Sequence, residues 1–251
     1  MQRRISRTVS LCRALLSLSV LSSAACAGTP LPEPPDELPK PDFGSFVRDV
    51  VTLAGLPDRP PLLLSAGPGA VQANTPVWII NLDSSDAPVQ VASDSVGGFR
   101  APPVPASASD RVRVLSRTER QHSAPLDLRT IMADVSDAPL EAAPLPESGL
   151  SCFSVTPSPT LVLRKSQGTL RLDNACGVTV DLTRVALRFG DQNLALSAAP
   201  ARLSAGQQVE LDLADSQGPG ASERLEIVLI DVQAADGRSG RYAIDVFSAL
   251  E

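Results

Sequence analysis

The feature that most constrains the fold is a series of short segments in which every second residue is apolar. Val89-Gln90-Val91 is one such segment, and residues 111–115 and 209–213 are others, with turn-forming Gly, Pro, Asp and Ser residues between them. A period of two places the apolar side chains on one face of an extended strand, whereas an amphipathic helix needs a period near 3.6. Strands that recur between turn signals predict a sandwich or barrel. We therefore expect an all-β body.

Composition supports this class and excludes one kind of partner. The 251 residues include 23 prolines, which favour turns and sheet edges over long helices, and the 43% hydrophobic content is enough for packed cores. The net charge is −6, and residues 1–26 carry four arginines and no acid, so their removal would leave −10. Because an acidic chain without a basic cluster is repelled by phosphate, we expect no nucleic-acid partner.

The N-terminus has the pattern of a secretory signal peptide, assigned to residues 1–25. Residues 1–13 are polar and carry Arg3, Arg4, Arg7 and Arg13, and residues 14–25 are uncharged, apolar and small. A basic segment followed by a short apolar segment and small residues is typical of an export signal. The apolar stretch is shorter than the roughly 20 residues that a membrane-spanning helix needs.

The residues around Cys26 resemble the lipobox of bacterial lipoproteins. Ala24 and Ala25 match the small residues that precede the invariant cysteine of that family, while Ser23 stands where the family usually has Leu. The resemblance implies that Cys26 carries a diacylglycerol, and Ala27 after it favours the outer membrane over inner-membrane retention. Ordinary cleavage by signal peptidase at an A-x-A-type site is the alternative.

The number of cysteines favours lipidation of Cys26. Cys12 would be lost with the leader, and an acylated Cys26 would leave Cys152 and Cys176 as an even pair. Exported proteins keep few free thiols, so we expect these two to form a disulfide. It would join the first strand of the second module to the turn after Asn174.

Proline dominates the segment that follows. Six of the thirteen residues 29–41 are proline, which prevents helix or sheet pairing and favours extended polyproline II structure. We assign residues 26–45 as the lipidated cysteine and a proline-rich tether that holds a folded body away from a membrane.

Residues 46–120 are expected to form a first β-sandwich. Its predicted strands include residues 62–64, 77–82, 89–91 and 111–115. Gly69-Ala70-Val71, residues 75–81, Gly97-Gly98-Phe99 and residues 110–114 follow one another in the order seen in bacterial Ig-like and carboxypeptidase regulatory-like modules. The resemblance implies an Ig-like sandwich and brings no catalytic residue.

Two features of this module have alternative interpretations. Trp78, the single tryptophan, is interpreted as a core residue, with a carbohydrate-stacking platform as the alternative. Asp83, Asp86 and Asp94 could surround a calcium ion, but their spacing fits no EF-hand and Asp is common in turns.

Residues 121–150 are expected to be a linker, and residues 151–251 a second sandwich. Its predicted strands are residues 160–163, 169–173, 178–182, 185–189, 209–213, 225–232 and 242–247. The apolar phase slips at Thr183-Arg184, which predicts a bulge. The mostly apolar residues 225–232 suit a central strand buried on both faces. Leu172-Asp173-Asn174 and residues 200–207 resemble Ig-like modules of bacterial envelope proteins.

No catalytic motif is present. His122 is the single histidine, and the chain has no G-x-S-x-G, G-x-G-x-x-G, P-loop or H-E-x-x-H sequence. We expect no cofactor, metal or enzymatic activity. The sequence favours a cell-envelope lipoprotein that binds, scaffolds or assembles with a protein partner. The alternatives are a small-ligand or polysaccharide-binding protein and, third, a hydrolase that uses scattered carboxylates.

Overall fold

The computed structural model describes residues 37–47, 61–118, 121–132, 140–145, 149–163, 167–189, 192–195, 199–214 and 226–248. Within these ranges the regular structure consists of four β-sheets and one short 3-10 helix, η1 (Phe43–Ser45), without an α-helix. No helix in the same ranges is long and apolar enough to cross a membrane. The all-β class predicted from the alternating segments is therefore confirmed. Residues 36–251 belong to one compact unit.

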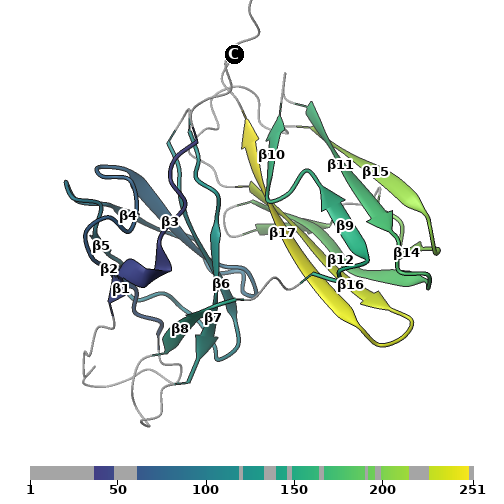
Figure 1. Cartoon of the computed structure of the whole chain (residues 1–251), viewed down its shortest axis with the longest axis horizontal. Coiled ribbons are helices and arrows are strands. Elements are labelled where there is room, and N and C mark those ends of the chain that lie inside the picture. The colour runs from purple at the N-terminus through teal and green to yellow at the C-terminus, as the bar shows by residue number, and fades with distance from the viewer. Residues whose placement is uncertain are drawn as a thin grey trace, which may run out of the picture. The chain divides into compact units, whose positions relative to one another are not determined.

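The first half of this unit, called here the N-terminal module (residues 37–145), contains two antiparallel sheets (Figure 1). One has the strand order β4-β3-β6-β7-β8, and the other the order β1-β2-β5. The strands are β1 (Phe46–Val47), β2 (Ser65–Ala66), β3 (Pro76–Asn81), β4 (Val89–Ala92), β5 (Phe99–Arg100), β6 (Arg111–Ser116), β7 (Leu126–Ile131) and β8 (Glu141–Pro144). Both sheets contribute to one apolar core.

Alternation along β3 and β6 sends neighbouring side chains to opposite faces of the larger sheet. Val77, Ile79, Val112 and Val114 enter the core of the N-terminal module and are fully buried. The intervening residues point to the other face, yet all six residues of β6 are buried. The expectation that β6 is half-buried is therefore wrong, because its second face is covered as well.

The prediction that residues 121–150 form a linker is wrong for most of this segment. β7 pairs antiparallel with β6, and β8 pairs antiparallel with β7, so both strands extend the larger sheet. β7 has the buried-exposed alternation of a strand on a core, with Leu126 and Leu128 inside. Prolines and polar residues around these strands concealed them in the sequence. The N-terminal module therefore extends beyond residue 120.

The end of the expected tether also differs from the prediction. Leu38 is 8% exposed, its amide donates a hydrogen bond to the His122 carbonyl at 3.0 Å, and Pro41 is buried. The Asp42 amide bonds to the Ala70 carbonyl at 2.8 Å, and η1 follows. Residues 37–45 thus pack on the N-terminal module, because Leu38 and Pro41 are buried and the amides of Leu38 and Asp42 bond to carbonyls of that module. The earlier tether residues and Cys26 lie outside the described residues.

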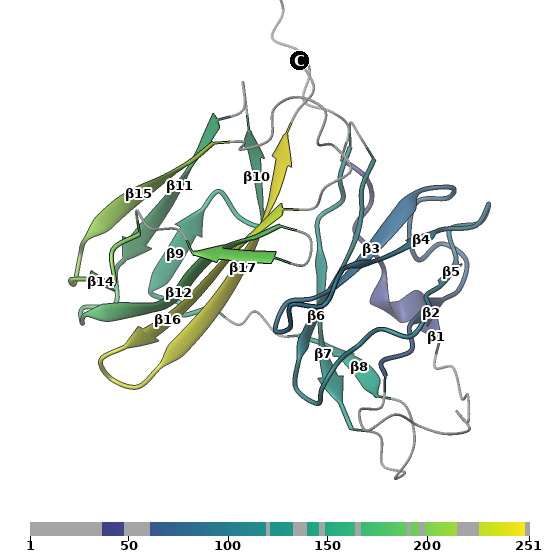
Figure 2. The same cartoon turned by 180° about the vertical axis from the view of Figure 1, so that it is seen from behind.

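The second half, called here the C-terminal module (residues 149–248), is also built from two sheets (Figure 2). One sheet has the order β10-β17-β16-β12-β13, with β14 also paired to β12, and the other the order β15-β11-β9. The strands are β9 (Phe153–Thr156), β10 (Thr160–Leu163), β11 (Gln167–Asn174), β12 (Val180–Phe189), β13 (Gln192–Ala195), β14 (Arg202–Leu203), β15 (Gln208–Ala214), β16 (Glu226–Ala234) and β17 (Ser239–Ser248). β10 pairs parallel with β17, and the other named pairs in this module are antiparallel.

Two detailed expectations for this module are confirmed. The register between β12 and β16 shifts between Leu182 and Arg184, where the apolar phase slips in the sequence. β16 lies between β12 and β17, and its first five residues are all buried. Val228 and Ile230 enter the core between the two sheets, while Ile227 and Leu229 face away from it. The continuous apolar segment therefore reflects two covered faces.

The expected disulfide is present. Cys152 lies just before β9 and Cys176 just after β11, with their Cα atoms 4.6 Å apart. Beside the bridge, the Asn174 side chain is fully buried and donates hydrogen bonds to the Val178, Leu203 and Ser204 carbonyls. The bridge and this amide together fix the first strand of the module to the turn between β11 and β12.

Candidate functional site: the contact between the two modules

The outer faces of β3 and β6 in the N-terminal module pack against the outer faces of β16 and β17 in the C-terminal module. Six buried apolar residues form this shared cluster, with the partly buried Trp78 packed against them: Ile80, Leu82, Leu115, Ile227, Leu229 and Ala243. In an isolated antiparallel sandwich these faces would meet water. Trp78 thus packs against apolar side chains of the module contact, as expected for a core residue.

A charged group lies beside the apolar cluster and crosses between the modules. The Arg113 guanidinium of β6 donates from Nη1 to Asp245 Oδ1 of β17 at 2.7 Å. Its Nε and Nη2 donate to the two carboxylate oxygens of Asp127 on β7 at 2.7 and 2.8 Å. Arg113 is 2% exposed and the Asp245 side chain 8%, so the pair is shielded from water and salt.

Burial and ion pairing shift the pKa values of these groups in opposite directions. Burial alone would lower the pKa of Arg113, but Asp245 and Asp127 outweigh it and raise the pKa, so this guanidinium stays charged. Burial raises the pKa of Asp245; Arg113 and Arg117 oppose this rise, while the nearby Asp127 carboxylate adds to it. Asp245 Oδ2 is buried and has no hydrogen-bond partner among the described residues. The negative charge of ionised Asp245 is therefore only partly balanced by the groups around it.

The hairpin end that joins β6 to β7 contacts the end of β17. The Arg117 guanidinium carbon lies 5.0 Å from the centre of the Phe247 ring, and Arg117 Nη1 donates to the Val246 carbonyl at 3.3 Å. The His122 ring lies 4.9 Å from the same phenyl ring. Burial lowers the pKa of Arg117, with Asp245 and Glu226 opposing the effect. Phe247, which is 2% exposed, is thus held between two side chains of the other module.

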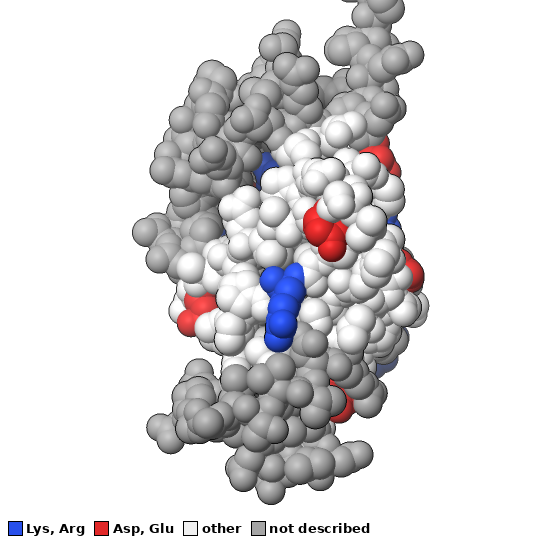
Figure 3. All heavy atoms as spheres, turned by 90° about the vertical axis from the view of Figure 1, so that its left-hand side faces the viewer, with Lys and Arg blue, Asp and Glu red and all other residues white. Residues whose placement is uncertain are grey.

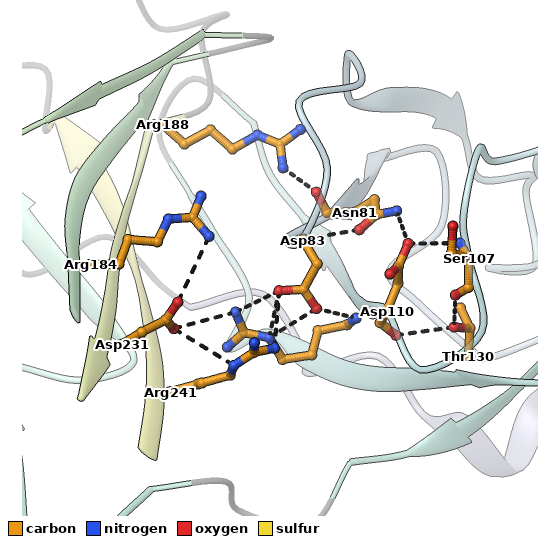
Figure 4. A network of polar contacts seen from close by, with 10 residues as sticks. Asn81, Asp83, Ser107, Asp110, Thr130, Arg184, Arg188, Asp231 and Arg241 are labelled. Atoms are coloured by element: carbon orange, nitrogen blue, oxygen red, sulfur yellow. Dashed lines mark hydrogen bonds and ion pairs between the residues drawn. The ribbon is translucent and has the colours of Figure 1, made fainter. Parts of the chain in front are cut away.

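A second charged group lies at the other end of the contact (Figure 4). Asp83 accepts from the Arg111 backbone amide at 2.8 Å and from its Nη2 at 3.0 Å, and also from Arg241 Nη1 of β17 at 3.3 Å. Asp231 of β16 lies 3.8 Å from Arg111 Nη2 and 4.0 Å from Arg184 Nη1. Burial alone would raise the pKa of Asp83, but the hydrogen bonds from Arg111 outweigh it and lower the pKa.

Figure 4 also shows how the loops around this group are fixed. The Asn81 side chain donates to Asp110 Oδ2 at 2.8 Å, and Asp110 Oδ2 also accepts from the Ser107 amide at 2.7 Å. Arg188 of β12, 1% exposed, donates to the backbone carbonyls of Asn81 and Asp86. An arginine of the C-terminal module therefore satisfies carbonyl groups of the N-terminal one.

Two of the three acids that could have surrounded calcium, Asp83 and Asp94, have other partners. Asp83 joins the charged group above, and Asp94 accepts the amides of Val96 and Gly98 within a turn. Among the described residues, no group of three or more His, Cys, Asp or Glu is placed to hold a metal ion. His122, the single histidine of the sequence, contacts Phe247.

The charged contact was missed in the sequence, although one signal was present. In residues 242–247 a single acid, Asp245, interrupts an apolar segment, and two arginines alternate with valines in residues 111–115. The alternating pattern predicts that such charged residues face solvent. A charged residue inside an apolar strand is also consistent with a buried ion pair. Comparisons with protein-family models and with curated proteins found no match.

Proposed function

We propose that this chain is a non-enzymatic cell-envelope lipoprotein whose two β-modules act as one scaffold for binding or assembly. The observation that carries the proposal is the contact between the modules. Arg113 and Asp245, two of the buried charged residues among those described, pair across it beside the apolar cluster. Buried ionisable groups are often catalytic, but here their partners are one another, which supports a mechanical role.

The strand order of the C-terminal module supports the Ig-like part of the proposal. β9, β11 and β15 share one sheet, and β12, β16 and β17 share the other. In an Ig sandwich strands A, B and E lie opposite strands C, F and G. The same division holds here when β10, β13 and β14 are counted as additional strands and no described strand is assigned to position D. The disulfide differs from the usual inter-sheet bridge, because Cys152 precedes β9 and Cys176 follows β11.

A sparsely charged surface of the N-terminal module supports a protein partner. Val47 and Val96 are 54% and 56% exposed, and the Val96 carbonyl accepts a hydrogen bond from the Gly69 amide at 2.7 Å. Figure 3 shows the described part of this side of the molecule, where charged side chains are few. Exposed apolar surface is found at contact sites more often than on the rest of a protein's surface.

The anchor is tested by replacing Cys26 with Ser in the producing bacterium and separating its membranes by density. The wild-type protein is expected in the outer-membrane fraction, and Cys26→Ser in the soluble envelope fraction. Unchanged membrane association of the variant would show that no lipid holds the protein there.

The binding role is tested by photo-crosslinking in the same cells. A benzophenone amino acid is placed at Val96, and at Glu210 on the exposed polar face of β15 as the matched control. We expect one discrete adduct from position 96 and none from position 210. Equal crosslinking at both positions, or none at either, argues against a partner on this surface.

A further inference from the structure

Asp245 is the most deeply buried of the described acids at the module contact. It lies on β17 but faces the N-terminal module, and one of its oxygens is paired with Arg113 while the other is buried without a described hydrogen-bond partner. Arg113 also donates to Asp127, so Asp245 shares its hydrogen-bonded cation with a second carboxylate. Protonation of Asp245 would remove the uncompensated charge.

The charged and titratable groups around Asp245 come from each element that packs on it. β6 contributes Arg113, the residue just after this strand is Arg117, and β7 contributes Asp127. Glu226, 8% exposed, lies on β16 and interacts with Arg117, and His122 contacts Phe247 two residues further along β17. On β10 the residue paired with Asp245 is Thr160, which does not titrate.

We propose that Asp245 is a proton-operated latch, so that the joined modules hold one more proton than separated modules and acidity tightens their contact. The proposal concerns the described body alone and does not depend on the lipid anchor. It gives the scaffold a contact whose strength follows the acidity of its surroundings.

The direction of the pH effect follows from the linkage between proton binding and separation of the modules. The pKa of Asp245 is raised above 3.8 when the modules are joined, because burial penalises the carboxylate. Separation exposes the group to water and returns its pKa to the ordinary range. Between these two values the joined form binds more protons, so separation becomes more favourable as pH rises through this window and stops changing above it.

Separation can be followed by the reactivity of a buried thiol. Ala243 belongs to the shared apolar cluster and is 8% exposed, so Ala243→Cys in a Cys26→Ser background reacts with a thiol reagent only when the modules part. Ser95→Cys, on an exposed turn, reports the intrinsic reactivity at each pH. The ratio of the two rates measures the fraction of molecules that are open.

The ratio is expected to rise with pH above 3.8, by up to about tenfold per pH unit, and to level off once the pH exceeds the raised pKa of Asp245. Asp245→Asn should make it independent of pH. Asp127→Asn removes the carboxylate that raises the Asp245 pKa, so it should move the transition to lower pH. This second variant keeps the latch testable if Asp245→Asn does not fold.

Four results would overturn the latch. The first is a ratio that does not vary with pH in the otherwise wild-type chain. The second is a pH dependence that persists unchanged in Asp245→Asn, and the third is a transition that Asp127→Asn leaves in place. The fourth concerns His122: the pH dependence should survive in His122→Gln, and its loss there would assign the effect to the imidazole.

Discussion

Arg113 on β6 and Asp245 on β17 lie 132 positions apart in the chain and meet at 2.7 Å across the contact between the two modules. A buried ion pair contributes little net stability, because the cost of removing both charges from water offsets most of their attraction. Its effect is on specificity, since any other arrangement of these two sheet faces would leave one of the charges buried without a partner.

Removing one member of this pair should therefore be more damaging than removing both. Arg113→Met leaves Asp245 buried without its main partner, and we expect a loss of about 3–5 kcal/mol in the free energy of unfolding. The double variant Arg113→Met, Asp245→Leu should recover much of that loss. Urea denaturation followed by Trp78 fluorescence measures both.

The matched control for this comparison is the exposed pair between Arg202 and Asp181, whose side chains are 67% and 46% exposed. Arg202→Met should have no measurable effect, because water screens this pair. A double variant at Arg113 and Asp245 less stable than Arg113→Met would contradict the account.

Asp83 should make the protein sensitive to acid. Its pKa is lowered by hydrogen bonds from Arg111 that outweigh burial, so its ionised form stabilises the folded state. This contribution to stability is fully present above pH 3.8, the ordinary pKa of an Asp carboxyl. It disappears as the pH falls through the lower pKa that Asp83 has in the folded protein. We expect Asp83→Asn to be less stable than wild type at pH 7 and to lose less stability between pH 4 and 2. Thermal melts across this range test it, and parallel pH curves for the two proteins would refute it.

Two glycines with the same backbone conformation should differ in their tolerance of a methyl group. Gly69 and Gly97 have φ angles of 80° and 81°, but a Cβ at Gly69 would meet open space and a Cβ at Gly97 would collide with the Val71 carbonyl oxygen. Gly69→Ala should cost about 1–2 kcal/mol, the left-handed strain alone. Gly97→Ala should cost about 1–3 kcal/mol more, because the backbone must move. Equal losses in denaturant titrations would show that the turn around Gly97 is pliable.

The strands and their contact were not equally predictable from the sequence. The alternation of residues 209–213 and the phase slip at Thr183-Arg184 are local, so they identified β15 and the bulge in β12. The mostly apolar residues 225–232 indicated that β16 has two covered faces, but nothing local says which elements cover the second face.

The charged contact depends on partners far apart in the chain. Arg113 and Asp245 each occupy a position that alternation assigns to water, and only the packing of β6 on β17 makes them buried. The strands β7 and β8 were missed for a related reason. Prolines and short polar stretches surround them, and the pairing of β7 with β6 and of β8 with β7 overrides that local signal.

The bridge between Cys152 and Cys176 gives the last prediction. It closes a loop with a sequence separation of 24, and a cross-link of that span lowers the entropy of the unfolded chain. In the chain-entropy account it contributes about 3 kcal/mol, so the double variant Cys152→Ser, Cys176→Ser should lose that amount in urea denaturation. Wild type reduced under native conditions should lose the same amount, which separates the effect of the cross-link from that of the serines. Mass spectrometry after alkylation should show two added groups at these cysteines only when a reductant precedes it. Labelling without reductant would mean that the bridge does not form in the exported protein.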